Sequence, residues 1–380
     1  MRLFRYYRRV LMISAILLLL FLVPWWTLVG APDWPTPVAV LGSVLVGLCF
    51  VGLPTLMFLG HGPRQSDAAG AVGDTLLGVT WVVFSESVLG NLAGLVLLAA
   101  GVPDPSRSRI VAVAVLGVAL ALAGWGVFEA RRVPRVRALD VVIPRLGAGL
   151  DGLRLAVITD THFGPLDRAN WSAKVAGAVN ALHPDVACHA GDLADGPVAR
   201  RHRQVDPLAG VRAELGKFYI TGNHEYFGEA QAWLDHMAGI GWQPLHNQHQ
   251  VVCRGGDRLV IAGIDDPTGA GLPGHGPDLP AALAGTDPAL PVVLLAHQPK
   301  LLAQAAEAGV ALQISGHTHG GQIWPFHYLV RLDQPVLAGL SRHGAGTQLY
   351  TSRGTGFWGP PLRVFAPSEI TLLTLRAPTN

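Results

Sequence analysis

Apolar residues fill four long stretches in the first 130 residues, and only short breaks rich in Gly, Pro, Arg and Asp separate them. Each stretch is long enough for a helix to cross a bilayer, which takes about 20 residues. The predicted spans are approximately Val10–Val29, Val38–Leu59, Thr75–Ala100 and Ile110–Phe128. The pattern therefore predicts a transmembrane region of four helices over residues 1–130, followed by a basic linker over residues 131–149.

From residue 150 to residue 380 the pattern changes to short apolar runs that alternate with helical segments. The runs predict buried strands at Leu153–Thr159, Asp185–Ala190, Gly216–Thr221, Leu259–Ile264, Val292–Ala296 and Ala311–Ser315. Helical periodicity fits between several of them, at Trp171–Leu182, Ala230–Ala238 and Leu301–Ala308. Such alternation favours an α/β layered domain, which the final stretch, Gln348–Leu375, closes with further strands.

The basic residues near the predicted helix ends lie mostly on one side of the bundle. One side carries nine, namely Arg2, Arg5, Arg8, Arg9, Arg64, Arg131, Arg132, Arg135 and Arg137. The opposite loops carry only Arg107 and Arg109. Because basic segments stay in the cytoplasm, we expect a multi-pass protein of the inner (plasma) membrane with both termini and the second domain cytoplasmic. Arg8-Arg9 faintly resembles an export signal, but four spans without a cleavage site outweigh it.

The third predicted span contains an unusual acidic residue. Glu86 lies near its middle, where a carboxylate is costly unless it faces the bundle interior. Either Glu86 contacts a lipid substrate or an ion, or it is a neutral acid hydrogen-bonded to Ser85, Asn91 or another helix. Gly90 and Gly94 are spaced for close helix packing.

The composition of the chain narrows the classes of binding partner to be expected. Half of the residues are apolar, 14% are charged and the formal net charge is +2. So small a net charge gives no reason to expect nucleic acid as a partner. Cys49, Cys188 and Cys253 have neither metal-ligand spacing nor a disulfide framework, and we expect them to be small buried side chains.

Polar side chains with glycine beside them follow nearly every predicted strand. The clusters are Asp160-Thr161-His162, Gly191-Asp192, Gly222-Asn223-His224-Glu225, His297 and Gly316-His317-Thr318-His319-Gly320. Ligands in open α/β sheets gather at the carboxyl ends of the strands. Imidazole and carboxylate groups suit Mn, Fe or Zn. The sequence therefore predicts one metal site built from several strand ends.

The order and spacing of these motifs resembles the calcineurin-like metallophosphoesterase superfamily, from Leu150 to the end of the chain. Three further segments are similar to a membrane-associated bacterial branch and to transmembrane proteins with a metallophosphoesterase domain. They are Asp151-Gly152-Leu153-Arg154, Gly263-Ile264-Asp265-Asp266 and Ser352-Arg353-Gly354-Thr355-Gly356. The resemblance implies that residues 150–380 fold as a two-sheet β-sandwich flanked by helices.

The resemblance also implies a centre with two divalent metal ions, Mn, Fe or Zn. The implied ligands are Asp160, His162 and His319 for the first ion, Asn223, His297 and His317 for the second, and Asp192 as the bridge. Two ions about 4 Å apart generate a hydroxide and clamp phosphoryl oxygens. By resemblance, His224 faces the scissile phosphate and protonates the leaving oxygen.

Other polar residues leave alternatives open. Asp265 and Asp266 either position substrate or a histidine behind the metals, or form a structural turn before Pro267. Arg353 and Arg363 either contact phosphate or form surface salt bridges. The remaining histidines match no family position, and we expect them on the surface or in the core: His183, His189, His202, His236, His246, His249, His275 and His327.

One departure from the family narrows the substrate. Protein phosphatases of this superfamily carry Asp-Arg-Gly after the Gly-Asp motif, whereas this chain has Asp195-Gly196-Pro197. Without that Arg, a phosphoprotein substrate is not expected. The leading hypothesis is hydrolysis of a phosphodiester or pyrophosphate in a lipid-linked molecule, such as one of UDP-diacylglucosamine type, at the bilayer. The alternatives are a phosphodiesterase of a soluble nucleotide, and a catalytically inactive membrane sensor or scaffold.

Overall fold

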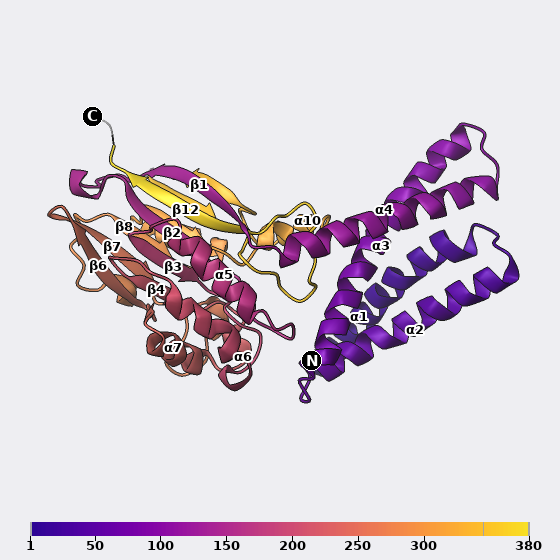
Figure 1. Ribbon diagram of the computed structural model, residues 1–380, viewed down its shortest axis with the longest axis horizontal. Helices are drawn as coiled ribbons and strands as arrows, with labels where there is room; N and C mark the ends of the chain where they lie inside the picture. Colours follow the sequence, from indigo (N-terminus) through magenta and orange to yellow (C-terminus); the bar gives the residue numbers. More distant parts are fainter. Residues whose placement is uncertain (1, 345, 379–380) are drawn as a thin grey trace. The chain divides into compact units, whose positions relative to one another are not determined.

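The computed structural model describes residues 2–344 and 346–378 of the 380-residue chain. The chain separates into two compact units (Figure 1). The first consists of Met1–Phe128 together with Pro360–Val364, and the second consists of Glu129–Gly359 together with Phe365–Asn380.

Four long helices make up most of the first unit. They are α1 (Arg2–Trp25), which continues into a short π-helix (Trp26–Gly30), α2 (Thr36–His61), α3 (Asp67–Ala99) and α4 (Ser106–Arg131). Each is long and apolar enough to cross a membrane. The prediction of four apolar helices is confirmed, and every helix begins before its predicted span, within the polar residues that precede it.

Glycines let neighbouring helices approach closely at two places. A Cβ on Gly60 of α2 would come within 2.4 Å of the Cα of Gly70 in α3. A Cβ on Gly90 of α3 would come within 2.3 Å of a methyl group of Val115 in α4. The predicted role of Gly90 in close helix packing is therefore confirmed.

Several polar side chains inside the helical unit are hydrogen-bonded. The amide of Asn91 donates to the hydroxyl of Thr27 at 2.7 Å, which joins α3 to the π-helix. The hydroxyl of Ser85 donates to the carbonyl of Trp81 at 2.9 Å. Glu86 is half-buried. Ser85 and Asn91, the two named partners expected for Glu86, therefore donate these hydrogen bonds to other groups.

The second unit contains two six-stranded sheets, with strand orders β1-β12-β2-β3-β4-β5 and β10-β11-β9-β8-β7-β6. The first sheet consists of β1 (Arg135–Val142), β2 (Leu153–Ile158), β3 (Val186–Ala190), β4 (Lys217–Ile220), β5 (Gln243–Pro244) and β12 (Glu369–Arg376). The second consists of β6 (Gln248–Arg254), β7 (Asp257–Gly263), β8 (Val292–Leu295), β9 (Leu312–Ser315), β10 (Gly339–His343) and β11 (Thr347–Thr351). Strands β2 to β5 run parallel, as do β7, β8, β9 and β11.

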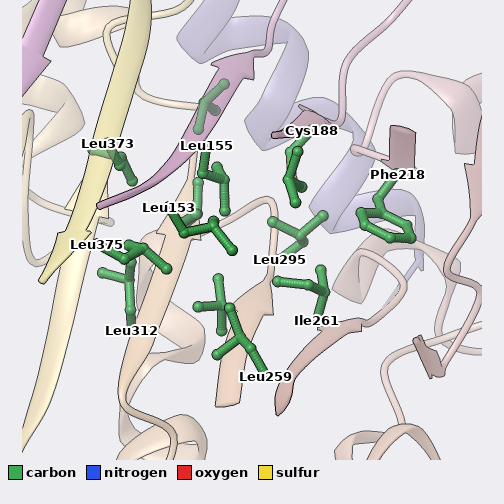
Figure 2. Close-up of a cluster of buried hydrophobic side chains, with 14 of the residues drawn as sticks. Leu153, Leu155, Cys188, Phe218, Leu259, Ile261, Leu295, Leu312, Leu373 and Leu375 are labelled. Carbon is green, nitrogen blue, oxygen red and sulfur yellow. The ribbon is translucent and has the colours of Figure 1, made fainter. Parts of the chain in front are cut away.

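The two sheets pack face to face over an aliphatic core (Figure 2). Leu155 and Cys188 of the first sheet point into the same cluster as Ile261 and Leu295 of the second. Residues alternate between the two faces of a strand. The odd-numbered residues of β2 therefore enter this core, while Ile158 enters a separate cluster under the helices. Burial on both faces explains why an inner strand such as β8 is apolar at every position.

Helices cover the outer faces of both sheets. α5 (Ala169–Asn180), α6 (Val198–Val205) and α7 (Ala230–Gly239) pack on the first sheet. α8 (Leu279–Leu283) and α9 (Leu302–Glu307) pack on the second. α5 illustrates the cause: Trp171, Val175 and Val179 recur every four residues, so they line one face of the helix. The predicted two-sheet sandwich flanked by helices is confirmed.

The structure corrects the predicted linker. Much of the segment 131–149 is strand β1, which pairs in parallel with β12. Arginines hide the strand pattern, because Arg135 and Arg137 point outward and pair with Glu129 and Glu369. One further expectation was wrong: Cys253 is exposed on β6, whereas Cys188 is buried in the core.

Candidate metal centre

Five strand ends supply the side chains of the candidate site. Asp160, Asp192 and Asn223 follow β2, β3 and β4 of the first sheet, and His297 and His317 follow β8 and β9 of the second. Because the strands are parallel within each sheet, their carboxyl ends gather at one edge. The predicted meeting of the five motifs therefore follows from the topology.

The backbone at this edge is strained. Five of the candidate ligands have a positive φ angle, namely Asp160 (53°), His162 (43°), Asp192 (51°), His317 (69°) and His319 (51°). Residues other than glycine rarely adopt this conformation, and it persists only where the surrounding structure enforces it. The strain turns successive side chains of one short loop toward the same point.

Two glycines let the loops approach each other. A Cβ on Gly222 would lie 2.2 Å from Oδ1 of Asp192, and a Cβ on Gly316 would lie 2.1 Å from Oδ2 of Asp160. Any larger residue would displace these carboxylates. The glycines of the Gly222-Asn223 and Gly316-His317 motifs are therefore needed for packing as well as for turning the chain.

The seven candidate ligands form two adjoining groups. Asp160, His162 and His319 place one ligand atom each within 4.8 Å of the others, and so do Asp192, His297 and His317. In the first group, His162 Nε2 lies 3.1 Å from His319 Nε2, and His319 Nε2 lies 3.5 Å from Asp160 Oδ1. Ligands about 2.1 Å from one ion are separated by such distances.

Asp192 lies where a bridging ligand is required. Its Oδ2 is 3.4 Å from Nε2 of His162 in the first group and 3.1 Å from Nε2 of His297 in the second. Asn223 completes the second group, since its Oδ1 lies 2.8 Å from Nδ1 of His317. The structure thus brings together all seven residues that the sequence assigned as ligands.

The hydrogen bonds of these histidines show that the site fits a cation. His297 Nδ1 lies 2.8 Å from the carbonyl of Ala190, so Nδ1 carries a proton and the ring directs Nε2 toward Asp192. Nε2 is buried without a hydrogen bond among the described residues, and it lies 3.1 Å from the Asp192 carboxylate. A cation, either a proton or a metal ion, between Nε2 and the carboxylate satisfies both groups.

Burial and neighbouring charges shift the pKa values of several candidate ligands. Burial raises the pKa of Asp160 and lowers the pKa of His317 to about 3. Burial also opposes ionisation of Asp192, but the neighbouring His297 and His224 outweigh it and hold the pKa of Asp192 well below its usual range. A divalent ion stabilises both a carboxylate and a neutral imidazole, which are the forms needed for coordination.

His224 stands beside the ligands. Its ring meets the ring of His162 edge-on, with centroids 4.5 Å apart, and its backbone N–H donates to Asp192 Oδ1 at 2.9 Å. His224 Nδ1 lies 2.7 Å from Asp195 Oδ1. Burial opposes protonation, but Asp192 and Asp195 outweigh it and raise the pKa of His224 to about 9. The imidazole is therefore set to carry a proton beside the metal centre.

Two acidic residues with no role assigned from the sequence support the site. Asp195 Oδ1 lies 2.9 Å from Nδ1 of His162, besides its contact with His224. Glu225 accepts hydrogen bonds from the backbone N–H groups of Asp192, Leu193 and Gly222, at 3.2, 2.7 and 2.6 Å. Their positions in the sequence could have indicated these roles. Glu225 ends the Gly222-Asn223-His224-Glu225 motif, and Asp195 begins the Asp195-Gly196-Pro197 segment just after Asp192.

A buried arginine also supports the first metal loop. The guanidinium of Arg168 donates to the carbonyls of Thr161 and His162. It stacks on the ring of Phe357 at 4.3 Å and on that of Trp171 at 4.8 Å. No motif marks Arg168, because its function depends on a fold in which residues 161 and 357 are neighbours.

The remaining predicted site residues lie around the ligands or elsewhere. Arg353 packs against Gly320 in the His319 loop and lies 4.0 Å from Glu369. Arg363 is fully buried and belongs to the segment Pro360–Val364 of the helical unit, where its backbone N–H donates to Gly126. Of the two alternatives given for Arg363, its burial excludes a surface salt bridge.

Asp265 and Asp266 stabilise two neighbouring loops by hydrogen bonds. Asp266 caps the turn Pro267–Gly269 and accepts from the amide of Gln298, which follows a metal ligand, at 2.8 Å. Asp265 contacts His246 at 2.6 Å.

His189 takes no place among the ligands. Its Nε2 lies 3.1 Å from the hydroxyl of Thr161, and its ring packs edge-on against those of Tyr219 and Trp242. Burial lowers the pKa of His189 to about 3. The histidine is thus a neutral core residue behind the site, as expected from the sequence.

Comparison with known proteins agrees with this geometry. Residues 153–321 match the family model described as calcineurin-like phosphoesterase. The chain is 34% identical over 304 residues to an uncharacterized metallophosphoesterase of Campylobacter jejuni, covering 78% of this chain and 79% of that protein. It is 36% identical over 278 residues to the transmembrane protein with metallophosphoesterase domain of Danio rerio, covering 71% of this chain and 63% of that protein.

Fold, ligand set and similarity together define a metallophosphoesterase with a metal centre of the binuclear type. The chain belongs to the calcineurin-like phosphoesterase family. It spans less than two thirds of its animal relatives, 63% of the Danio rerio protein and 59% of the Bos taurus protein. Both relatives are named as transmembrane proteins. The four apolar helices of this chain are likewise long and apolar enough to cross a membrane.

Proposed function

We propose that this protein hydrolyses a phosphodiester or pyrophosphate bond in a lipid-linked substrate, at the cytoplasmic face of the membrane that anchors it. A molecule of UDP-diacylglucosamine type belongs to this class. The observation that carries the proposal is a pair of exposed aromatic rings beside His224. Phe227 is 69% exposed with its ring 5.1 Å from that of His224, and Trp358 is 46% exposed with its ring 6.1 Å away.

These rings form the apolar part of an otherwise polar site. Large apolar side chains exposed next to a reactive centre are typical of a surface that binds an apolar ligand. Trp358 is also fixed to the metal loop, since its backbone exchanges two hydrogen bonds with the side chain of Gln322, at 2.8 and 2.9 Å. Gln322 lies three residues after the ligand His319. An acyl chain or prenyl group on these rings would bring its phosphate to His224.

The chain connection gives independent support for a substrate in the bilayer. α4 ends at Arg131 and β1 begins at Arg135, so only residues 132–134 join the last apolar helix to the sandwich. Arg132 lies in this stretch and Arg131 and Arg135 flank it, and basic residues at a membrane surface attract anionic headgroups, each contributing about 1 kcal/mol. A short basic connection favours a substrate that is itself held in the membrane.

In this reaction the ions, Mn, Fe or Zn, would supply the nucleophile and neutralise the phosphoryl oxygens. The chain performs the other tasks. Asp160, His162 and His319 would hold one ion, Asn223, His297 and His317 would hold the other, and Asp192 would contribute to both. His224 donates a proton to the leaving oxygen, and Asp195 keeps its imidazole oriented and charged.

The second candidate is hydrolysis of a soluble nucleotide, because exposed aromatic rings also stack on nucleobases. The two hypotheses are distinguished by comparing the activity on a lipid-linked substrate with the activity on its water-soluble headgroup analogue. Full-length protein in detergent micelles with Mn²⁺ would be assayed on both, and on bis(p-nitrophenyl) phosphate, which needs no apolar recognition. We expect kcat/KM to be highest for the lipid-linked substrate. A higher value for the soluble nucleotide would overturn the proposal.

Substitution of Trp358 tests whether the exposed rings recognise the apolar part of the substrate. Trp358→Ala should lower kcat/KM for the lipid-linked substrate about tenfold, the equivalent of about 1.4 kcal/mol of lost aromatic contact, and leave the nitrophenyl ester within about twofold. Tyr328→Ala is the matched control, since this exposed aromatic lies on α10 (His327–Val330) and stacks on His327 instead. Equal losses on both substrates would argue against apolar recognition by Trp358.

A further inference from the structure

A second group of metal-ligating side chains lies outside the seven-residue centre. It consists of His246, between β5 and β6, Asp265, after β7, and His275, in the loop before α8. One ligand atom from each lies within 4.8 Å of the others. No sequence pattern connects these three residues, because His246 and His275 lie outside the family motifs.

The geometry surrounds one carboxylate with two imidazoles. His246 Nδ1 lies 2.6 Å from Asp265 Oδ1, and His275 Nδ1 lies 3.6 Å from Asp265 Oδ2. The two imidazole rings are 5.0 Å apart. Asp265 is only 2% exposed, so its negative charge is withdrawn from water and needs compensation within the protein.

Hydrogen bonds satisfy Asp265, which accepts from His246 at 2.6 Å and from the backbone N–H of Gly276 at 3.0 Å, but they leave His275 unsatisfied. Nδ1 of His275 is buried and makes no hydrogen bond among the described residues, and 3.6 Å to Asp265 is too long for one. The catalytic centre has the same feature, where the buried Nε2 of His297 faces Asp192 without a hydrogen bond. In both places a cation would satisfy an imidazole lone pair and a carboxylate at once.

The ligands are held by a framework that needs no ion. Asn247 accepts hydrogen bonds from the backbone N–H groups of Asp265 and Asp278, at 3.2 and 2.9 Å, and donates to the carbonyl of Gly276 at 2.8 Å. Gly276 in turn donates to Asp265 Oδ2 at 3.0 Å. These bonds leave acceptor positions of the carboxylate open. The loop is thus closed around the three ligands.

We propose that His246, Asp265 and His275 form a third metal site, which binds Zn²⁺ and stabilises the loop from Asp265 to Asp278. Two imidazoles and one carboxylate suit Zn²⁺, with solvent completing its coordination. The loop borders the catalytic unit, because the ring of His275 packs edge-on against Tyr226 at 5.4 Å. The hydroxyl of Tyr226 lies 3.0 Å from that of Thr221, one residue before the Gly222-Asn223 motif. The third ion therefore stabilises the support of the active site and takes no part in the chemistry.

Metal stoichiometry tests this site separately from the proposed reaction. Full-length protein in detergent would be stripped with a chelator, reloaded with Zn²⁺, dialysed and analysed by mass spectrometry of the metal. We expect three Zn²⁺ per chain in the wild type, and two in His246→Gln and in His275→Gln. His249→Gln is the matched control and should keep three, because His249 lies on β6 and contacts the carbonyl of Ala282 instead. Two ions in the wild type, or three in both cluster variants, would overturn the proposal.

A second measurement guards against misfolded variants. Co²⁺ reports its coordination by visible absorption, and Asp192→Asn weakens the catalytic centre without touching the cluster. We expect Asp192→Asn to retain a tightly bound Co²⁺ whose absorption disappears when His275→Gln is added. Circular dichroism must show the same helix content in both proteins. Retention of the band in the folded double variant would contradict the site.

Discussion

Asp195 and His224 form a hydrogen-bonded pair beside the metal ligands, with Oδ1 of the carboxylate 2.7 Å from Nδ1 of the imidazole. Burial opposes ionisation of Asp195, but His162 and His224 outweigh it and hold the pKa of Asp195 well below its usual range. The carboxylate therefore stays charged and fixes which nitrogen of His224 carries a proton toward it. The other ring nitrogen is left to serve the substrate.

The pair predicts the effect of Asp195→Asn. An amide keeps the shape of the side chain but removes the charge that favours the imidazolium form of His224. We expect kcat to fall by roughly 10²-fold while bound metal stays near two equivalents at the catalytic centre. Asp206→Asn is the control, because Asp206 also contacts two histidines, His202 and His236, at 3.1 and 3.0 Å. Loss of metal together with activity would show that Asp195 acts mainly through the ligand His162.

His224→Gln tests proton donation itself. The variant should bind metal like the wild type, while turnover falls by roughly 10²–10⁴-fold. The loss should be much smaller for a substrate with a good leaving group, such as nitrophenol, because that group departs without a proton. Steady-state kinetics on a matched pair of esters measures the difference. An equal loss on both esters would contradict the role of His224 as general acid.

Asp192→Asn should affect both ions. The carboxylate lies 3.4 Å from His162 and 3.1 Å from His297, so one substitution removes a negative ligand from both groups. We expect lower metal occupancy at the centre and loss of nearly all turnover. Asp235→Asn, an exposed carboxylate on α7 that pairs with Gln231, is the control. Wild-type activity at full metal occupancy in Asp192→Asn would exclude the binuclear assignment.

The sequence located the seven candidate ligands because each belongs to a short local motif at a strand end. It assigned no function to Asp195 and Glu225, although Glu225 ends one of these motifs and Asp195 lies three residues after the ligand Asp192. Their function depends on which backbone groups and rings lie opposite them, and that is decided by pairing between strands. β1 was missed for a related reason, since Arg135 and Arg137 resemble a basic linker until Glu129 and Glu369 are placed beside them.

Glu225→Gln predicts a loss of stability. The carboxylate accepts hydrogen bonds from backbone N–H groups on the Asp192 and Gly222 loops, and an amide would turn one acceptor into a donor facing them. Leaving a buried N–H unsatisfied costs about 1–3 kcal/mol. We expect a lower melting temperature of the chelator-treated protein by differential scanning fluorimetry. Glu214→Gln, at an exposed position, should melt with the wild type, and an unchanged Glu225→Gln would show that the loops do not depend on this carboxylate.

The orientation of the catalytic unit is predicted by the basic residues that flank the helices. Nine arginines lie on one side of the bundle and two on the other. The structure adds that both arginines, which lie in the first turn of α4, have partners nearby. Arg107 pairs with Asp104, and Arg109 donates to the carbonyl of Pro32 at 2.9 Å and stacks on Trp34 at 5.4 Å. Arg132, Arg135 and Arg137 on the other side are paired as well, so the prediction rests on the number of arginines alone.

Positive residues resist transfer across the membrane, so the side with nine arginines should be cytoplasmic. Four helices return the chain to the side on which it started, so the segment before α1 and the sandwich after α4 share one compartment. A green fluorescent protein fused after Asn380 should therefore fluoresce, because it folds in the cytoplasm, and an alkaline phosphatase fused there should be inactive. Fusions after Asp33, in the loop between α1 and α2, are the control and should give the reverse pattern. Active phosphatase after Asn380 would place the metal centre outside the cytoplasm and remove lipid precursors of the inner leaflet from its substrates.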